Sequence, residues 1–381
     1  MPVRPVRLVP GPEVEAWGDP DIEAYTRGAL RDGVPAPTSL AIEANAPRVL
    51  RAFGRFWWTT VRGTSLDPAL VERLRVRMAE ASGCLYCATS SMDVDRIAPP
   101  VTPAETTDDR DALATEAADR LATDPASLGA ELREGLVAAF DPHELAELLA
   151  FLAWQSGGPR AIRAWGAEAY KPGSRVDAAH LPVPLPYASR TDTLPEPPEP
   201  PSVDVEAVLA IAERSGWPPP GWARLLAPRP AIIAAWLGLI EATTTGAPLG
   251  DRTGMLVRLA VGGAVGVPSF MPADGPGVVD AGISHDEARA VASGDSASLA
   301  PAERLAVAWA RALTIRGEVP DDLRVAALDT LGDAAVVQLG FAVATLAGAG
   351  RVQRWFDDRG DDAADAAGGI RPIRIVGQAG S

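Results

Sequence analysis

Residues 72–92 read ERLRVRMAEASGCLYCATSSM and contain the only two cysteines of the 381-residue chain, Cys84 and Cys87. The cysteines have C-x-x-C spacing, and a Ser-Gly pair at residues 82–83 interrupts the helical pattern just before them. If a new helix begins there, Cys84, Cys87 and Ser91 lie at i, i+3 and i+7 and share one face. Unpaired backbone N–H groups at the start of a helix favour a thiolate. The stretch therefore predicts a reactive dithiol at a break between two helices.

The flanking sequence is helical on both sides of this stretch. Apolar positions between residues 66 and 81 follow one helical face, and Asp67-Pro68 is typical of an N-cap followed by proline at the first helical position. A second start of this kind, Asp141-Pro142, precedes LAELLAFLAWQ, which is apolar nearly all round. We expect this second helix to be buried.

Composition and charge limit the class of protein. Hydrophobic residues make up 47% of the chain, aromatic residues 6% and charged residues 22%, which suits a soluble, mainly helical protein. The net charge of -15 opposes binding to nucleic acid or to an anionic membrane surface. The N-terminus has prolines and charges where a secretory signal needs an apolar run, and two cysteines do not make a disulfide framework. We therefore expect an all-α cytoplasmic protein.

Residues 181–203, LPVPLPYASRTDTLPEPPEPPSV, are rich in proline and predict a linker between two domains, at 1–180 and 204–358. We expect the last residues, 359–381, to form an acidic flexible tail. The second half repeats the helical pattern of the first in degenerate form. RLRVRMAEASG at 73–83 lines up with GMLVRLAVGGA at 254–264, which pairs Arg77 with Arg258 and puts Val265 and Pro268 where the cysteines stand. This predicts two tandem copies of one helical unit, of which only the first has thiols.

A resemblance to a known family rests on these residues. The chain resembles the carboxymuconolactone decarboxylase superfamily, closest to its alkyl hydroperoxidase D-like branch. The resemblance is carried by Glu72, eleven further residues and then Cys84-Leu85-Tyr86-Cys87, and by the LATEAADRL and DPHELAELLAFLA segments that follow. The motif of that branch is E-x11-C-x-x-C-x3-H, and its final histidine is Ser91 here. The resemblance implies an all-helical fold, peroxide reduction through a cysteine pair, no cofactor, and assembly into trimers or hexamers.

The same resemblance implies roles for individual residues. Cys87 would attack the peroxide, Cys84 would resolve the sulfenic acid as a disulfide, and Glu72 would relay the proton. Ser91 cannot hold the positive charge of a histidine, so Tyr86, Ser90 or an ordered water would have to substitute. Tyr86 and Trp58 are candidates for contact with the substrate. His143, His180 and His285 are scattered, so we expect no metal site.

Three functions remain open from sequence. The first is a thiol-dependent oxidoreductase that acts on a hydroperoxide and is regenerated by a dithiol reductant protein. The second is a lyase, decarboxylase or isomerase that acts on a small organic acid, against which the intact cysteine pair speaks. The third is a non-catalytic scaffold, suggested by the missing histidine and the second copy without cysteines. In each case we expect a homo-oligomer, and a trimer of tandem units would form a six-copy ring.

Overall fold

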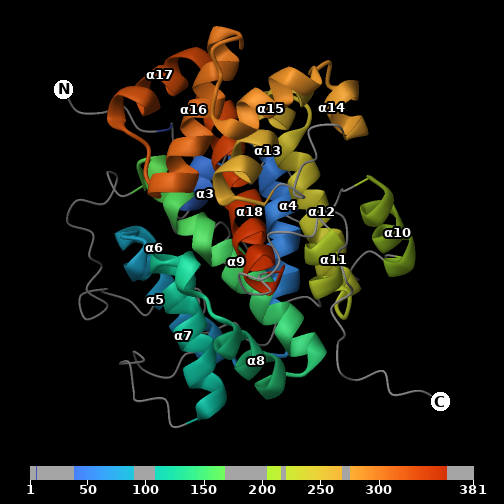
Figure 1. Ribbon diagram of the computed structural model, residues 1–381. Coiled ribbons are helices and arrows are strands. Elements are labelled where there is room, and N and C mark those ends of the chain that lie inside the picture. Colours follow the sequence, from blue (N-terminus) through green and yellow to red (C-terminus); the bar gives the residue numbers. More distant parts are fainter. Residues whose placement is uncertain are drawn as a thin grey trace, which may run out of the picture.

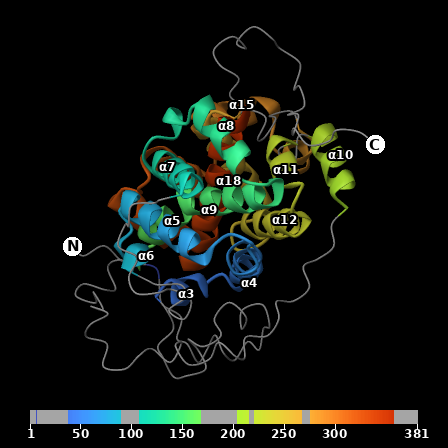
Figure 2. The same ribbon diagram turned by 90° about the horizontal axis from the view of Figure 1, so that it is seen from below.

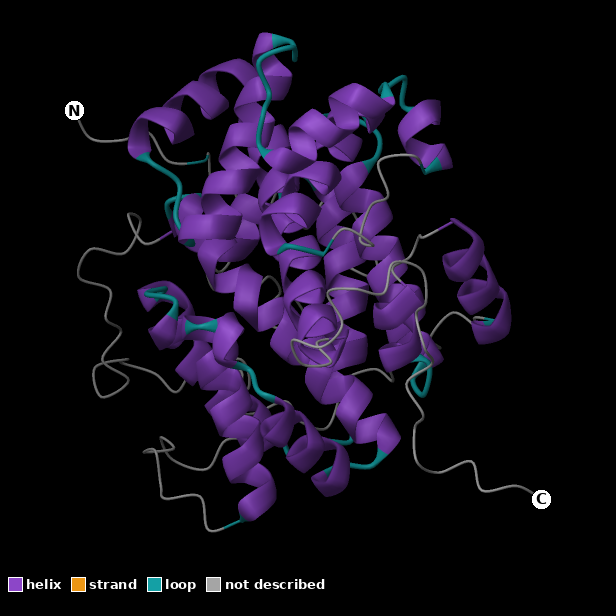
Figure 3. Ribbon diagram, in the orientation of Figure 1, coloured by secondary structure: helices purple, strands orange, loops and turns teal. Residues whose placement is uncertain are grey.

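The computed structural model describes residues 6, 38–89, 108–167, 204–215, 220–267 and 275–357. Within these ranges every regular element is a helix and no strand occurs (Figure 3). The prediction of an all-α protein is confirmed. The proline-rich linker, the acidic tail and Ser91 lie outside these ranges, so the predictions made for them stay predictions.

The helices of the first half lead to and follow the cysteine stretch. They are α3 (Thr38–Glu43), α4 (Pro47–Trp57), a π-helical turn η1 (Trp58–Arg62), α5 (Pro68–Ala81), α6 (Leu85–Thr89), α7 (Asp109–Thr123), a 3-10 turn η2 (Pro125–Ser127), α8 (Ala130–Ala139) and α9 (Pro142–Ala164). The helices of the second half are α10 (Val205–Ser215), α11 (Pro220–Leu226), α12 (Pro230–Thr244), α13 (Asp251–Val265), α14 (Pro276–Asp280), α15 (His285–Ser293), α16 (Pro301–Arg316), α17 (Asp321–Leu331) and α18 (Asp333–Asp357).

Helices α9 and α18 lie against each other in the centre of the molecule, with the other helices around them (Figures 1 and 2). Their closest approach is at glycines. A Cβ added to Gly348 would lie 1.9 Å from the Ala153 carbonyl oxygen, and one added to Gly157 would lie 2.6 Å from the Ala344 Cα. Only glycine fits such a crossing, because neither backbone can move aside alone. The predicted burial of the helix after Asp141 is confirmed.

The helix starts follow the signals in the sequence. The Asp67 side chain accepts a hydrogen bond from the Ala69 N–H, and the Asp141 side chain accepts from the N–H groups of His143 and Glu144. The Glu144 side chain in turn accepts a hydrogen bond from the Asp141 N–H, which completes a capping box. Asp67 and Asp141 therefore begin α5 and α9 where the sequence predicted.

One helix of the described part, Asp333–Phe356, is long and apolar enough to cross a membrane by length and composition. Its most apolar stretch is completely buried by the other helices of the fold. This is the situation of a core helix in a soluble protein, which passes the same test of length and composition.

The two halves repeat particular contacts. Arg163 on α9 donates to the Ser82 carbonyl at the end of α5, and Arg354 on α18 donates to the Val265 carbonyl at the end of α13. Gly83 and Gly266, the next residues in each half, have φ of 71° and 77°. Each carbonyl is thus capped by an arginine from the central helix of its own half.

A second repeated contact involves the loops that lead into α5 and α13. Glu147 on α9 accepts from the Ser65 N–H at 2.8 Å, and Gln338 on α18 accepts from the Leu249 N–H at 3.0 Å. These pairs align the start of α5 with the start of α13, just as the capped ends align Gly83 with Gly266.

The alignment from structure corrects the one drawn from sequence. Arg258 corresponds to Arg75 and not to Arg77, and Val267 occupies the place of Cys84, which the sequence alignment had given to Val265. The error arose because the alignment followed residue types, whereas the caps and the loop contacts locate the helix ends. The largest hydrophobic cluster contains residues from both halves. Tandem duplication and the division into two domains stay predictions.

Candidate functional site: a buried dithiol turn

The end of α5 positions the first cysteine. Gly83 adopts the left-handed conformation, its N–H donates to the Glu80 carbonyl, and the Cys84 N–H donates to the Ala79 carbonyl, both at 2.9 Å. This pattern is a Schellman motif with Gly83 at C′ and Cys84 at C″. Helix α6 then begins at Leu85. The predicted break and the new helix at the cysteines are confirmed.

Both cysteines are free and buried. Cys84 is 0% exposed and Cys87 is 7% exposed. The Cys87 backbone N–H donates to Cys84 Sγ at 3.3 Å, so the two residues contact each other in the reduced form. A donor aimed at a sulfur stabilises negative charge on it. The structure therefore shows a dithiol whose two members are already paired through a hydrogen bond.

Glu72 reaches the cysteine turn through an arginine. Arg75 donates from Nε to Glu72 Oε2 at 2.7 Å and from Nη2 to Glu72 Oε1 at 2.6 Å, and its Nη1 donates to the Cys87 carbonyl oxygen. Both side chains of this ion pair are buried. The hydrogen bonds that the described structure gives the Glu72 carboxylate go to the guanidinium and not to a sulfur. Its role in proton relay stays a prediction.

Tyr86 on α6 forms hydrogen bonds with Ser39 on α3. Its hydroxyl accepts from the Ser39 N–H at 3.1 Å and shares a hydrogen bond with Ser39 Oγ at 2.9 Å. Burial raises the pKa of Tyr86 to about 12; the contacts with Ser39 act in the opposite direction, and the charges of Glu43 and Cys87 raise it further. A phenol with this pKa is neutral at physiological pH. Tyr86 thus lies beside Cys87, while its role in substrate binding stays a prediction.

Trp58 lies on a different element from this group. Trp58 begins the π-helical turn η1, which packs against α4, α9 and α12, whereas α6 packs against α5 and α9. Ser91 lies beyond the described residues. The structure thus brings together Glu72, Cys84, Tyr86 and Cys87, and it leaves the suggested roles of Trp58 and Ser91 as predictions.

Two residues of the site were missed from sequence. Arg75 had a signal, since it follows Glu72 by three positions on one helix and such acid-base pairs face each other. Ser39 had none, because it is 47 residues from Tyr86 and is brought there by tertiary packing. In the part of the chain that the structure covers, no group of three or more His, Cys, Asp or Glu residues lies close enough to hold a metal ion.

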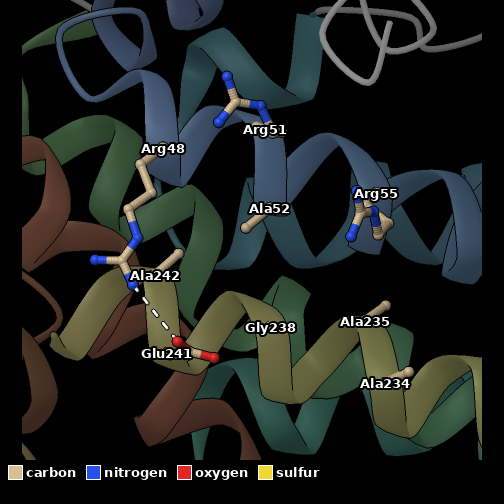
Figure 4. Close-up of a pocket in the computed structure, with 9 residues that line it drawn as sticks. All are labelled: Arg48, Arg51, Ala52, Arg55, Ala234, Ala235, Gly238, Glu241 and Ala242. Carbon is tan, nitrogen blue, oxygen red and sulfur yellow. Dashed lines mark ion pairs between the residues drawn. The ribbon is translucent and has the colours of Figure 1, made fainter. Parts of the chain in front are cut away.

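A shallow pocket lies apart from the dithiol, between α4 and α12 (Figure 4). Its volume is about 190 Å³. Arg48, Arg51 and Arg55 line it from α4, and small residues of α12, including Gly238, line the opposite side. Arg48 donates to the Thr245 carbonyl at 2.8 Å. The pocket contains none of the residues predicted for the site.

No protein-family model, curated protein or solved structure matches this chain. Fold and site together define an all-α protein with a buried C-x-x-C dithiol at a helix break. Its relation to the alkyl hydroperoxidase D-like branch stays a prediction from the residue pattern.

Proposed function

We propose that the chain is a thiol-dependent oxidoreductase that reduces a hydroperoxide through Cys84 and Cys87. The observation that carries the proposal is the contact from the Cys87 N–H to Cys84 Sγ, which holds two free thiols at one helix break. Cys87 is the more exposed of the two, which suits the residue that meets the peroxide first.

The reaction has two steps. The Cys87 thiolate attacks the O–O bond of a hydroperoxide, forms a sulfenic acid and releases an alcohol, whose oxygen takes a proton. Cys84 then attacks the sulfenic sulfur, forms the Cys84–Cys87 disulfide and releases water. A dithiol reductant protein returns both cysteines to thiols. Glu72 would relay the proton, and no cofactor is needed for either step.

The test is a titration of the full-length protein with a hydroperoxide, with mass spectrometry of the thiols. We expect the wild type to form the intramolecular disulfide faster than a free-thiol control, and Cys84→Ser to stop at a sulfenic acid on Cys87. Cys87→Ser should form neither product. Ser91→His should raise turnover by supplying the histidine of the motif. A wild type that reacts no faster than the free-thiol control would falsify the proposal.

A non-catalytic scaffold is the second candidate, because Cys84 is 0% exposed and the second half has Val267 in its place. The two candidates differ in turnover and not in folding. A scaffold would give the same oligomer and the same stability for wild type and Cys87→Ser, with no peroxide consumption by either. A lyase or isomerase would act on a small organic acid and would retain activity in both cysteine variants.

We further propose that the protein is cytoplasmic, where the dithiol stays reduced, and that it assembles as a homo-oligomer. The negative net charge supports a protein that binds neither nucleic acid nor membrane. Analytical ultracentrifugation tests the assembly: a trimer of tandem units predicts three times the mass of one chain.

A further inference from the structure

We propose that Arg75 is a positioning residue of the dithiol site, which holds the Cys87 main chain and the Glu72 carboxylate in fixed relation to each other. The inference rests on the proposed thiol chemistry and adds a residue to it. The Arg75 side chain is 4% exposed, and its guanidinium joins three groups: the two oxygens of Glu72 and the carbonyl oxygen of Cys87.

The planar guanidinium suits this task. Nε and Nη2 form one edge and bind the carboxylate side-on, which leaves Nη1 free to point at the carbonyl. A lysine ammonium has no such fork and cannot make the bidentate pair and the carbonyl contact in the same geometry. Each buried charge also has its partner, so neither Arg75 nor Glu72 bears the cost of an isolated buried ion.

The contact determines where Cys87 lies. The Cys87 carbonyl oxygen on α6 accepts a hydrogen bond from Arg75 Nη1 on the preceding helix α5. At the other end of the same residue, the Cys87 N–H is held by Cys84 Sγ. With both backbone polar groups held, the position of the Cys87 main chain relative to Cys84 is fixed as well.

Arg75 also sets the charge balance around the thiols. The charged and titratable groups that face the turn come from every helix packed on it: Glu72 and Arg75 on α5, Glu43 on α3, Arg163 on α9 and Tyr86 on α6 itself. Arg163 is itself paired with the Glu318 carboxylate at 2.7 Å, so loss of Arg75 would leave Glu72 without the guanidinium that binds it and would make the charge around the turn more negative. Negative charge near a thiol disfavours its thiolate, so the variant should react only at higher pH.

The second half of the chain supplies a matched control. Arg258 stands at the place of Arg75 and is also buried, at 7% exposure, and burial lowers its pKa to about 9. Met255 stands at the place of Glu72, and the position of Cys84 is occupied by Val267. Substitution of Arg258 therefore removes a buried arginine from the corresponding helix without touching the dithiol.

The experiment compares full-length wild type, Arg75→Met, Arg75→Lys and Arg258→Met. Two rates are measured on the reduced proteins: alkylation by iodoacetamide as a function of pH, and disulfide formation with hydrogen peroxide or with oxidised dithiothreitol. We expect Arg75→Met to raise the pH of half-maximal alkylation by about one unit, which is about tenfold slower alkylation at neutral pH, and to slow disulfide formation by a similar factor. Arg75→Lys should restore the pH profile but not the disulfide rate. Arg258→Met should match the wild type in both.

The proposal is overturned if Arg75→Met behaves as the wild type, or if Arg258→Met changes both rates as much. If Arg75→Met does not fold, Arg75→Lys decides: a disulfide rate equal to that of the wild type rejects the positioning role. The proposed function fails separately. A wild type inert to hydrogen peroxide, with an alkylation profile that still depends on Arg75, would reject peroxide reduction and keep Arg75 as the residue that positions the dithiol.

Discussion

The crossing of α9 and α18 can be tested with one added methyl group. Gly348→Ala places a Cβ 1.9 Å from the Ala153 carbonyl oxygen, about 1.5 Å short of the 3.4 Å at which ordinary contact begins. The oxygen belongs to the backbone of α9, so relief requires the two central helices to separate. Gly238→Ala on α12 is the matched control, because its Cβ meets nothing within 4 Å.

The two substitutions gain the same helix propensity, about 1 kcal/mol, when glycine becomes alanine inside a helix. Only Gly348→Ala also strains a packed core, which costs about 3 kcal/mol for a contact this short. We therefore expect Gly238→Ala to raise the free energy of unfolding by about 1 kcal/mol and Gly348→Ala to lower it by about 2 kcal/mol.

Urea unfolding followed by the helical circular dichroism signal measures the difference. With a denaturant slope of about 3 kcal/mol/M, the two midpoints should differ by about 1 M. A Gly348→Ala midpoint at or above that of the wild type would show that α9 and α18 do not cross as closely as described. The Gly238→Ala midpoint shows how much the change from glycine to alanine alters stability when the added Cβ meets no other atom.

Two further predictions concern buried polar groups. The Glu147 side chain is 0% exposed and lies 2.7 Å from Arg229 Nη2. Arg229→Met should therefore lower the free energy of unfolding in urea by about 3 kcal/mol, and the double variant Glu147→Gln/Arg229→Met should lose less than the sum of the two single variants. Additive losses would show that the two side chains do not interact. The pKa of Tyr86 is raised by burial from 10.0 to about 12, so the stability that its neutral phenol contributes is present below pH 10 and lost between pH 10 and 12. Ultraviolet titration should show a phenol ionising near pH 12 that Tyr86→Phe removes, and its persistence in that variant would contradict the assignment.

Local features were predictable because their causes are local. The N-caps at Asp67 and Asp141 involve residues two or three positions apart, and the break at residues 82–83 needs only a glycine that tolerates positive φ. For the same reason the sequence placed both cysteines at the start of a new helix. The helix after Asp141 is apolar nearly all round, which predicted its burial, and α9 confirms this.

The register between the halves was wrong because it followed residue identity. Arg77 matched Arg258 in the sequence, yet the corresponding arginine is Arg75, since each half ends its helix at a capped carbonyl followed by a glycine of positive φ. A sequence comparison does not reveal that Arg163 and Arg354 donate hydrogen bonds to the carbonyls at those helix ends. The donors lie on helices that are distant in the chain.

By itself, the sequence determined an all-helical chain, its principal helix starts and a C-x-x-C pair at a helix break, because propensity, capping and turn chemistry act within a few residues. Tertiary structure alone decided what surrounds the pair. Arg75 joins Glu72 to the Cys87 carbonyl across the break, and Ser39 meets Tyr86 from 47 residues away. These contacts depend on how α3, α5 and α6 pack, and the burial that gives each charge its partner exists only once they have packed.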